Sequence, residues 1–106
     1  MTRRDAFVAI ADPTRRRILD LLQRRGPLVA GEVSGCFARA SRPGISRHLR
    51  VLRDCGVVRV RRRGREQLYT LQPKPLMQLR DGWLGKFGDM QRESLRALRT
   101  IVETRG

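Results

Sequence analysis

The sequence predicts a mainly α-helical chain (class α+β) with about five helices and a two-stranded β-hairpin between the fourth and fifth helices. Apolar residues recur at steps of three and four over most of the chain, which is the period of an amphipathic helix. Residues 57–71 instead alternate or are β-prone on either side of a glycine, which is typical of a hairpin. The length of 106 residues is enough for one domain and too short for two.

The first two helices are separated by a capping signal. Residues 7–11 form a short helical segment, and Asp12 and Pro13 suit the N-cap and the first position of the second helix. Gly26 and Pro27 end that helix. Its apolar stripe consists of Ile18, Leu19, Leu21 and Leu22.

The third and fourth helices follow directly. A short third helix is expected from Val29 to about Ala38, with Val29, Val33 and Phe37 on one face. Ser41 suits the N-cap of the fourth helix, which Cys55 and Gly56 close. Its inward residues are Ile45, Leu49 and Leu52. Its outward residues are Arg42, Ser46, Arg47, Arg50 and Arg53. The fourth helix therefore has an apolar stripe behind a basic face.

The hairpin and one long helix complete the chain. Residues 57–61 and 67–71 are the expected strands, and the tip between them holds Arg62, Arg63, Gly64 and Arg65. The last helix is expected from Leu76 to Val102. Its apolar face consists of Leu76, Leu79, Trp83, Phe87, Met90, Leu95, Leu98 and Ile101. Gly82, Gly85 and Gly88 each cost this helix roughly 1 kcal/mol relative to alanine. Close approach of a neighbouring helix or a local kink would each explain them.

The charge points to a polyanionic partner. The chain has 24 Lys and Arg against 10 Asp and Glu, which gives a formal net charge of +14. A GC-rich genome can account for the preference for arginine over lysine, but it does not explain this surplus. There is no apolar run long enough to span a membrane and no signal-peptide pattern, so we expect a cytoplasmic protein.

The order of elements predicts a winged helix-turn-helix protein that binds double-stranded DNA in a sequence-specific way. A short helix directly precedes a second helix whose basic N-terminal half suits the major groove. The side chains placed to reach base edges are Arg42, Ser46, Arg47 and Arg50. The tip arginines Arg62, Arg63 and Arg65 would contact the backbone or the minor groove. Either basic feature alone can be a solvated surface, but their order and the net charge favour DNA.

Other functions fit the sequence less well. A non-specific DNA- or RNA-binding basic protein is the alternative, weakened because only Tyr69 offers an aromatic platform away from the apolar faces. A winged helix that binds a protein partner also remains open, because fold does not fix function. No catalytic triad, carboxylate pair or phosphate-binding glycine loop is present, so we expect no enzyme.

Several blocks of the sequence resemble the arsenic-repressor (ArsR/SmtB) family. They are residues 9–19, 41–52, 56–58, 64–65 and 69–71, and the resemblance covers about residues 5–72. It implies a dimeric repressor bound to an imperfect inverted repeat, often in its own promoter. By position, Ser41 to Arg50 would be the recognition helix and Arg61 to Arg65 the wing, while Thr14 and Arg15 would approach the phosphate backbone. His48 matches the family's recognition-helix histidine, for which a structural hydrogen bond and a phosphate contact both remain open.

The departures from the family concern metals. Metal-sensing members carry a Cys-x-Cys pair where Val29 and Gly31 stand here, and others use histidines in the last helix, which has none. The last helix is similar to that of a subgroup without known metal sites, so we expect no metal and no cofactor. Cys36 and Cys55 are expected to be small apolar residues, with a redox switch as the alternative. A small-molecule or redox effector is possible but unidentified.

The resemblance also implies that the first and last helices form a homodimer interface. The residues expected there are Phe7, Leu79, Trp83, Phe87, Met90, Leu95 and Leu98. A small-molecule pocket where the helices meet is the alternative for Trp83, Phe87 and Met90. We thus expect one domain over residues 1–106, with a DNA-binding core at 12–72 and dimerisation helices at 1–11 and 75–103.

Overall fold

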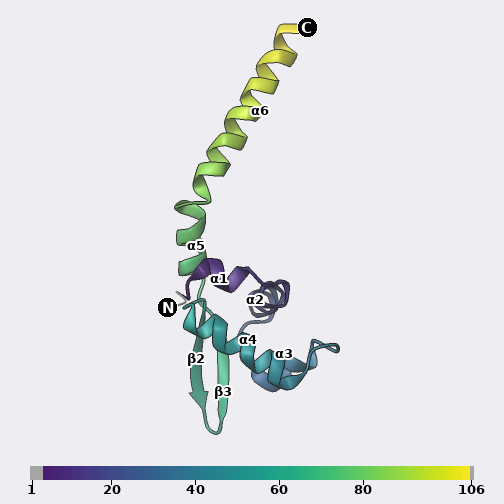
Figure 1. The fold of residues 1–106 in the computed structure, drawn as a ribbon, viewed down its shortest axis with the longest axis vertical. Coiled ribbons are helices and arrows are strands. Elements are labelled where there is room, and N and C mark those ends of the chain that lie inside the picture. Colours follow the sequence, from purple (N-terminus) through teal and green to yellow (C-terminus); the bar gives the residue numbers. More distant parts are fainter. Residues whose placement is uncertain (1–3, 106) are drawn as a thin grey trace. The chain divides into compact units, whose positions relative to one another are not determined.

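The computed structural model describes residues 4–105, with side chains described for residues 4–98. This part of the chain forms six helices and three strands, and Figure 1 shows how the ribbon runs through them. Their order is α1 (Ala6–Ile10), α2 (Pro13–Arg25), β1 (Leu28–Val29), α3 (Ala30–Gly35), α4 (Arg42–Asp54), β2 (Val58–Arg63), β3 (Glu66–Leu71), α5 (Lys74–Asp81) and α6 (Gly85–Arg105). The chain divides into two compact units, residues 1–76 and 77–106. The fold is mainly α-helical with a β wing, which confirms the predicted class.

The core of the first unit is built from α2, α3 and α4. Its most deeply buried large side chains are Ile18, Leu22, Val33, Ile45, Leu49, Leu52 and Val57. The predicted caps are present, because the Asp12 carboxylate accepts from the Arg15 backbone N–H at 3.1 Å and the Ser41 hydroxyl accepts from the Gly44 N–H at 3.1 Å. Gly56, with φ of 78°, follows α4 in the left-handed conformation.

The wing is a hairpin of β2 and β3, which lie side by side in Figure 1. Arg63 pairs with Glu66 in the register, so the loop contains only Gly64 and Arg65. Gly64 has φ of 62°, and among the described residues only glycines have a positive φ, so Arg65 has a negative one. A glycine at the first loop position followed by a residue with negative φ is the pattern of a type II′ turn, whose twist suits a hairpin.

The sheet has three strands because β1, which the sequence analysis missed, pairs with β3 in the order β1-β3-β2. Val29 lies opposite Leu68 in this antiparallel pair, so it belongs to β1 and not to the predicted helix 29–38. The third helix is shorter than expected. It ends at Gly35 because the Cys36 N–H donates to the Val33 carbonyl oxygen in a tighter turn, and Phe37 follows it half-buried.

The predicted single helix 76–102 is wrong, because the chain turns between α5 and α6 at residues 82–84. A Cβ on Gly82 would lie 3.0 Å from the Gln78 carbonyl oxygen, and one on Gly85 would lie 3.0 Å from that of Arg80. A side chain at either position would thus press against the chain's own carbonyl groups, which favours the kink over close approach of another helix as the reason for these glycines. The side chain of Ile101 lies outside the described residues. No helix among those described is long and apolar enough to cross a membrane.

Candidate nucleic-acid interface

Helix α4 presents the predicted recognition surface. Its rear face is fully buried through Ile45, Leu49 and Leu52. The side chains predicted to reach DNA are exposed on the other side, namely Ser41, Arg42, Ser46, Arg47 and Arg50. The helix is therefore held by the core on one side and offers hydrogen-bond donors on the other.

A small hollow lies where α3 meets the N-terminal half of α4. Its volume is about 150 Å³, and its lining is Ala30, Gly31, Ser34, Arg42 and Ser46. The structure thus brings two predicted DNA-binding residues together with Ser34, which sequence reasoning missed. A polar residue late in the first helix of the motif was the available signal, but the sequence alone does not show that it lies beside α4.

The wing places its arginines at the hairpin tip. Arg62, Arg63 and Arg65 are all exposed. The Arg63 guanidinium forms an ion pair with the Glu66 carboxylate at 3.2 Å, between side chains that are 68% and 57% exposed. Exposed ion pairs are weak. This pair therefore lowers the net positive charge of the tip but does not hold the Arg63 side chain in one position.

Arg15 points inward from the start of α2. Its Nε donates to the Ala9 carbonyl oxygen at 3.1 Å and its NH2 donates to that of Val8 at 2.8 Å. The NH1 atom lies 3.4 Å from Nδ1 of His48. Thr14, also predicted to approach the DNA backbone, is half-buried in the same turn.

His48 is half-buried beside Asp12. Its Nε2 lies 3.9 Å from Oδ2 of Asp12. Burial raises the pKa of Asp12, but the backbone N–H groups of Arg15 and Thr14 and the charges of His48 and Arg15 together bring it below its ordinary value. Asp12 therefore stays ionised close to the recognition helix.

The two cysteines are free and lie in different surroundings. Cys36 is exposed after α3, and the Arg25 NH1 donates to its Sγ at 3.6 Å. A hollow of about 250 Å³ adjoins it, lined by Arg17, Asp20, Leu21, Arg24, Cys36 and Phe37. Cys55 is buried, and burial raises the pKa of its thiol. Cys55 therefore packs as a small apolar residue.

The second unit exposes a row of large apolar side chains. Trp83, Phe87, Met90, Leu95 and Leu98 are between 49% and 62% exposed. The rings of Trp83 and Phe87 meet edge to face with centroids 4.8 Å apart. Leu79 is buried, and Phe7 in the first unit is 45% exposed. Several large apolar side chains exposed close together in the sequence often mark an interaction site.

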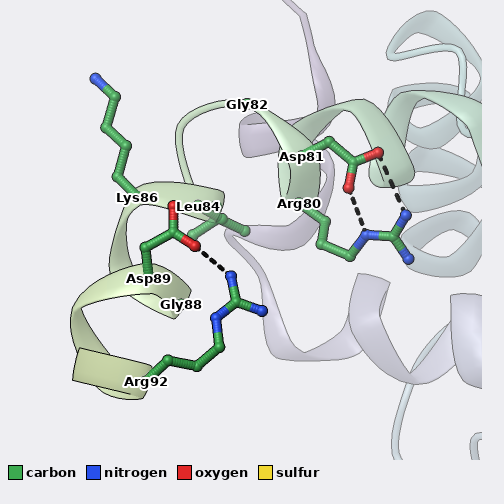
Figure 2. A pocket seen from close by; sticks show the side chains of 9 residues that line it. Arg80, Asp81, Gly82, Leu84, Lys86, Gly88, Asp89 and Arg92 are labelled. Atoms are coloured by element: carbon green, nitrogen blue, oxygen red, sulfur yellow. Dashed lines mark hydrogen bonds and ion pairs between the residues drawn. The ribbon is translucent and has the colours of Figure 1, made fainter. Parts of the chain in front are cut away.

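A hollow of about 520 Å³ surrounds the turn between α5 and α6 (Figure 2). Its lining combines five charged side chains with Leu84 and three glycines, and neither Trp83 nor Phe87 belongs to it. Arg80 pairs with Asp81 at 2.8 Å, and Arg92 pairs with Asp89, whereas Lys86 extends away from both pairs. This hollow therefore differs from the aromatic pocket considered as an alternative. Among the described residues there is no group of three or more His, Cys, Asp or Glu side chains that could hold a metal ion.

Known proteins resemble this chain in both sequence and fold. A helix-turn-helix domain family matches residues 10–61. The transcriptional repressor SdpR of Bacillus subtilis (strain 168) is 43% identical over 67 residues, which cover 63% of this chain and 72% of SdpR. The arsenic resistance transcriptional regulator ArsR1 of Pseudomonas putida is 40% identical over 68 residues, which cover 64% of this chain and 52% of that protein. The solved structure of an ArsR-like transcriptional regulator from Rhodococcus sp. RHA1 has a TM-score of 0.71 at 31% identity, covering 92% of this chain and 87% of the other.

Proposed function

Since this chain belongs to the ArsR/SmtB family of winged helix-turn-helix proteins and is a DNA-binding transcriptional repressor, not an enzyme, we propose that it acts as a homodimer on an inverted-repeat operator. The observation that carries this proposal is the two-sided character of α4. A helix that is buried behind and cationic in front can enter the major groove without losing its support.

The recognition surface consists of four residues on α4, Arg42, Ser46, Arg47 and Arg50. An arginine side chain can donate two hydrogen bonds to the O6 and N7 atoms of a guanine, which is the commonest specific contact in DNA complexes. We assign base contacts to Arg47 and Arg50, and backbone or base contacts to Arg42 and Ser46. Their exposure on one face of a single helix supports this assignment.

Contacts with the phosphate backbone come from the wing and from two helix starts. We assign Arg62, Arg63 and Arg65 to the backbone or the minor groove beside the operator half-site. Thr14 and Ser41 stand at the N-terminal ends of α2 and α4, where the positive end of the helix dipole favours an anion. For Arg15 and His48, the contacts with each other favour a supporting role over the predicted phosphate contact.

A second copy of the chain would cover the exposed apolar row. We propose that Trp83, Phe87, Met90, Leu95 and Leu98 form most of the dimer interface, and that Phe7 of the first unit also contributes to it. Leu79, which is already buried in one chain, would support the interface from beneath. A dimer can then set its two copies of α4 about 34 Å apart, one turn of DNA or a multiple of it.

The remaining assignments follow from this arrangement. Residues 12–72 would form the DNA-binding core, while segments 1–11 and 75–103 would dimerise, and the protein would act in the cytoplasm. We propose that the activity needs no metal and no cofactor. Val29 and Gly31 stand where metal-sensing relatives carry cysteines, and the described residues offer no alternative cluster of ligands.

Fluorescence anisotropy with a duplex from the protein's own upstream region tests the proposal. Binding is compared with a scrambled duplex at several salt concentrations, with EDTA and with tRNA as competitor. We expect a preference of about a thousandfold or more for the upstream duplex, unchanged by EDTA. Equal and steeply salt-dependent binding to both duplexes, with effective competition by tRNA, would instead favour the non-specific nucleic-acid-binding alternative.

A further inference from the structure

Arg15 connects two helices that are far apart in the sequence. Its Nε and NH2 atoms donate to the carbonyl oxygens of Ala9 and Val8, near the C-terminal end of α1. The last carbonyl groups of a helix lack i+4 partners within the helix, so Arg15 adds donors at the end of α1, where the Val8 oxygen also accepts from the Ala11 N–H. The third nitrogen, NH1, reaches His48 on α4 at 3.4 Å. All three nitrogens of the guanidinium thus contact protein atoms.

His48 continues the connection to Asp12. A guanidinium only donates hydrogen bonds, so Nδ1 of His48 acts as the acceptor in this contact and Nε2 remains as the donor of the ring. That Nε2 faces Oδ2 of Asp12 at 3.9 Å, and the same oxygen accepts from the Arg15 backbone N–H at 3.1 Å. Arg15, His48 and Asp12 therefore close a ring of contacts between the α1–α2 corner and the recognition helix.

We propose that Arg15 and His48 are positioning residues that orient the recognition helix against α1, and that neither contacts DNA. His48 lies between Arg47, which faces outward, and Leu49, which is fully buried. Fixing the His48 ring therefore fixes the rotation of α4 about its axis, and with it the direction of Arg47. The ion pair between Arg4 and Asp54 at 3.2 Å connects the segment before α1 to the end of α4 in the same way.

The inference rests on the proposed DNA-binding function, and it separates two roles that binding data can distinguish. A phosphate contact contributes to every duplex and to the salt dependence, about 0.9 in the slope of log K against log salt concentration. A positioning residue affects only the duplex whose bases are recognised and leaves the slope unchanged. The probe is a duplex selected by the protein itself from a random pool, with its scrambled version beside it.

The variants are Arg15→Gln, His48→Leu and their combination. We expect each single variant to weaken binding to the selected duplex about tenfold, the size typical of coupled hydrogen-bonded neighbours. The double variant should lose no more than the weaker-binding single variant. Binding to the scrambled duplex and the salt slope should stay as in the wild type. His48→Asn, whose side-chain oxygen can replace Nδ1 as acceptor, should bind the selected duplex within about threefold of the wild type.

Arg16→Gln is the matched control. Arg16 donates to the Ile10 carbonyl oxygen at 2.6 Å and is exposed, so this change removes one charge and one hydrogen bond to α1 without touching α4. Its effect should add to that of His48→Leu. Circular dichroism and thermal unfolding establish that each variant is folded. If Arg15→Gln does not fold, the difference between His48→Leu and His48→Asn in binding to the selected duplex tests the inference by itself.

Three results would overturn the inference while leaving the proposed function intact. The first is a drop of about 0.9 in the salt slope with equal loss on both duplexes in Arg15→Gln or His48→Leu. The second is His48→Leu binding the selected duplex like the wild type. The third is that the losses in Arg15→Gln and His48→Leu simply add. If the wild type selects no sequence and binds all duplexes equally, the proposed function fails, and the inference fails with it.

Discussion

Arg63 and Glu66 face each other across the two-residue tip of the wing, and their side chains form an ion pair at 3.2 Å. The pair places a carboxylate among three arginines, at the part of the hairpin that we assign to the DNA backbone. A phosphate that contacts Arg63 must therefore compete with Glu66 for the same guanidinium. We therefore expect the wing to bind DNA less strongly than its arginines alone would allow.

Replacing Glu66 with Gln should strengthen DNA binding regardless of sequence. We expect the affinity for operator and scrambled duplexes to rise by a similar factor, with a steeper dependence on salt, because Arg63 becomes free to pair with phosphate. Arg63→Ala should do the opposite, weakening both duplexes alike and flattening the salt slope. Glu93→Gln removes an equal charge from an exposed position on α6. An equal gain in that control would show that only net charge matters.

Arg47→Ala and Arg50→Ala should damage specificity more than general affinity. Each is expected to cost about 1–3 kcal/mol on the operator and to relax the preference at one base pair in each half-site. Arg53→Ala, an exposed arginine in the last turn of the same helix, serves as the control. Binding to a panel of single-substitution duplexes measures the effect. A uniform loss across the panel would contradict base contact by Arg47 and Arg50.

Asp12 should make the stability of the fold depend on acidity. Its pKa in the folded chain lies below the ordinary 3.8, so its ionised form stabilises the fold fully above that value. The contribution disappears as the pH falls through the lower folded pKa. Asp12→Asn keeps a capping oxygen without the charge, so the wild type should be more stable by about 0.3–1 kcal/mol at pH 6.

Urea unfolding at pH 6 and at pH 3 measures this difference. The gap between the wild type and Asp12→Asn should narrow at the lower pH. Asp12→Ala, which loses the cap entirely, should be less stable than Asp12→Asn by about 1 kcal/mol at both pH values. A gap between wild type and Asp12→Asn that is unchanged by pH would mean that the charge on Asp12 does not stabilise the fold.

The two thiols should differ in reactivity. Cys36 is exposed, whereas Cys55 is buried with its pKa raised by burial, and the thiolate is the reactive form. A coloured disulfide reagent should therefore titrate one thiol quickly in the native protein and the second only on unfolding. The Cys36→Ser variant should lose the fast phase and Cys55→Ser should retain it. If an oxidant alters operator binding, Cys36→Ser should abolish that response. Rapid labelling of native Cys55 would contradict its assignment to the core.

Introducing a charge into the apolar row should separate the proposed dimer. Phe87→Glu is expected to weaken self-association by about 2 kcal/mol or more, as at other buried aromatic interface positions. Sedimentation velocity would follow the dimer, and the operator should lose affinity while binding to a single half-site changes little. Lys86→Glu is the control, because Lys86 is the exposed neighbouring residue and extends away from the two ion pairs in Figure 2. A wild type that remains monomeric at micromolar concentrations would refute the dimer.

Local chemistry in the sequence was enough to predict the helices that matter most. Asp12 followed by Pro13 set the start of α2, and Ser41 set that of α4, because capping depends on residues within one turn. The inward positions of Ile45, Leu49 and Leu52 followed from helical spacing. The resulting division of α4 into a buried and an exposed face is the same in the structure.

What the sequence did not reveal depends on contacts between distant segments. Val29 belongs to a strand only because Leu68 lies opposite it, 39 positions along the chain (68 − 29). Arg15 resembled a surface cation, and its inward direction is decided by the ends of α1 and by His48 on α4. The glycines of the last segment signalled an irregularity, but not whether its cause was a neighbour or the chain's own backbone.

The short strand β1 gives the wing two parts with different resistance to local unfolding. At Leu68 and Tyr69, β3 pairs with β1 on one edge and with β2 on the other, whereas Glu66 and Gln67 pair with β2 alone. Local unfolding at Leu68 and Tyr69 breaks hydrogen bonds on both edges of β3. The backbone amides there should therefore exchange with solvent more slowly than those of Glu66 and Gln67 near the tip. Two-stranded ribbons also twist more readily than wider sheets. If the tip contacts the minor groove as proposed, we expect it to adapt to grooves of different width while Leu68 and Tyr69 stay in register with β1.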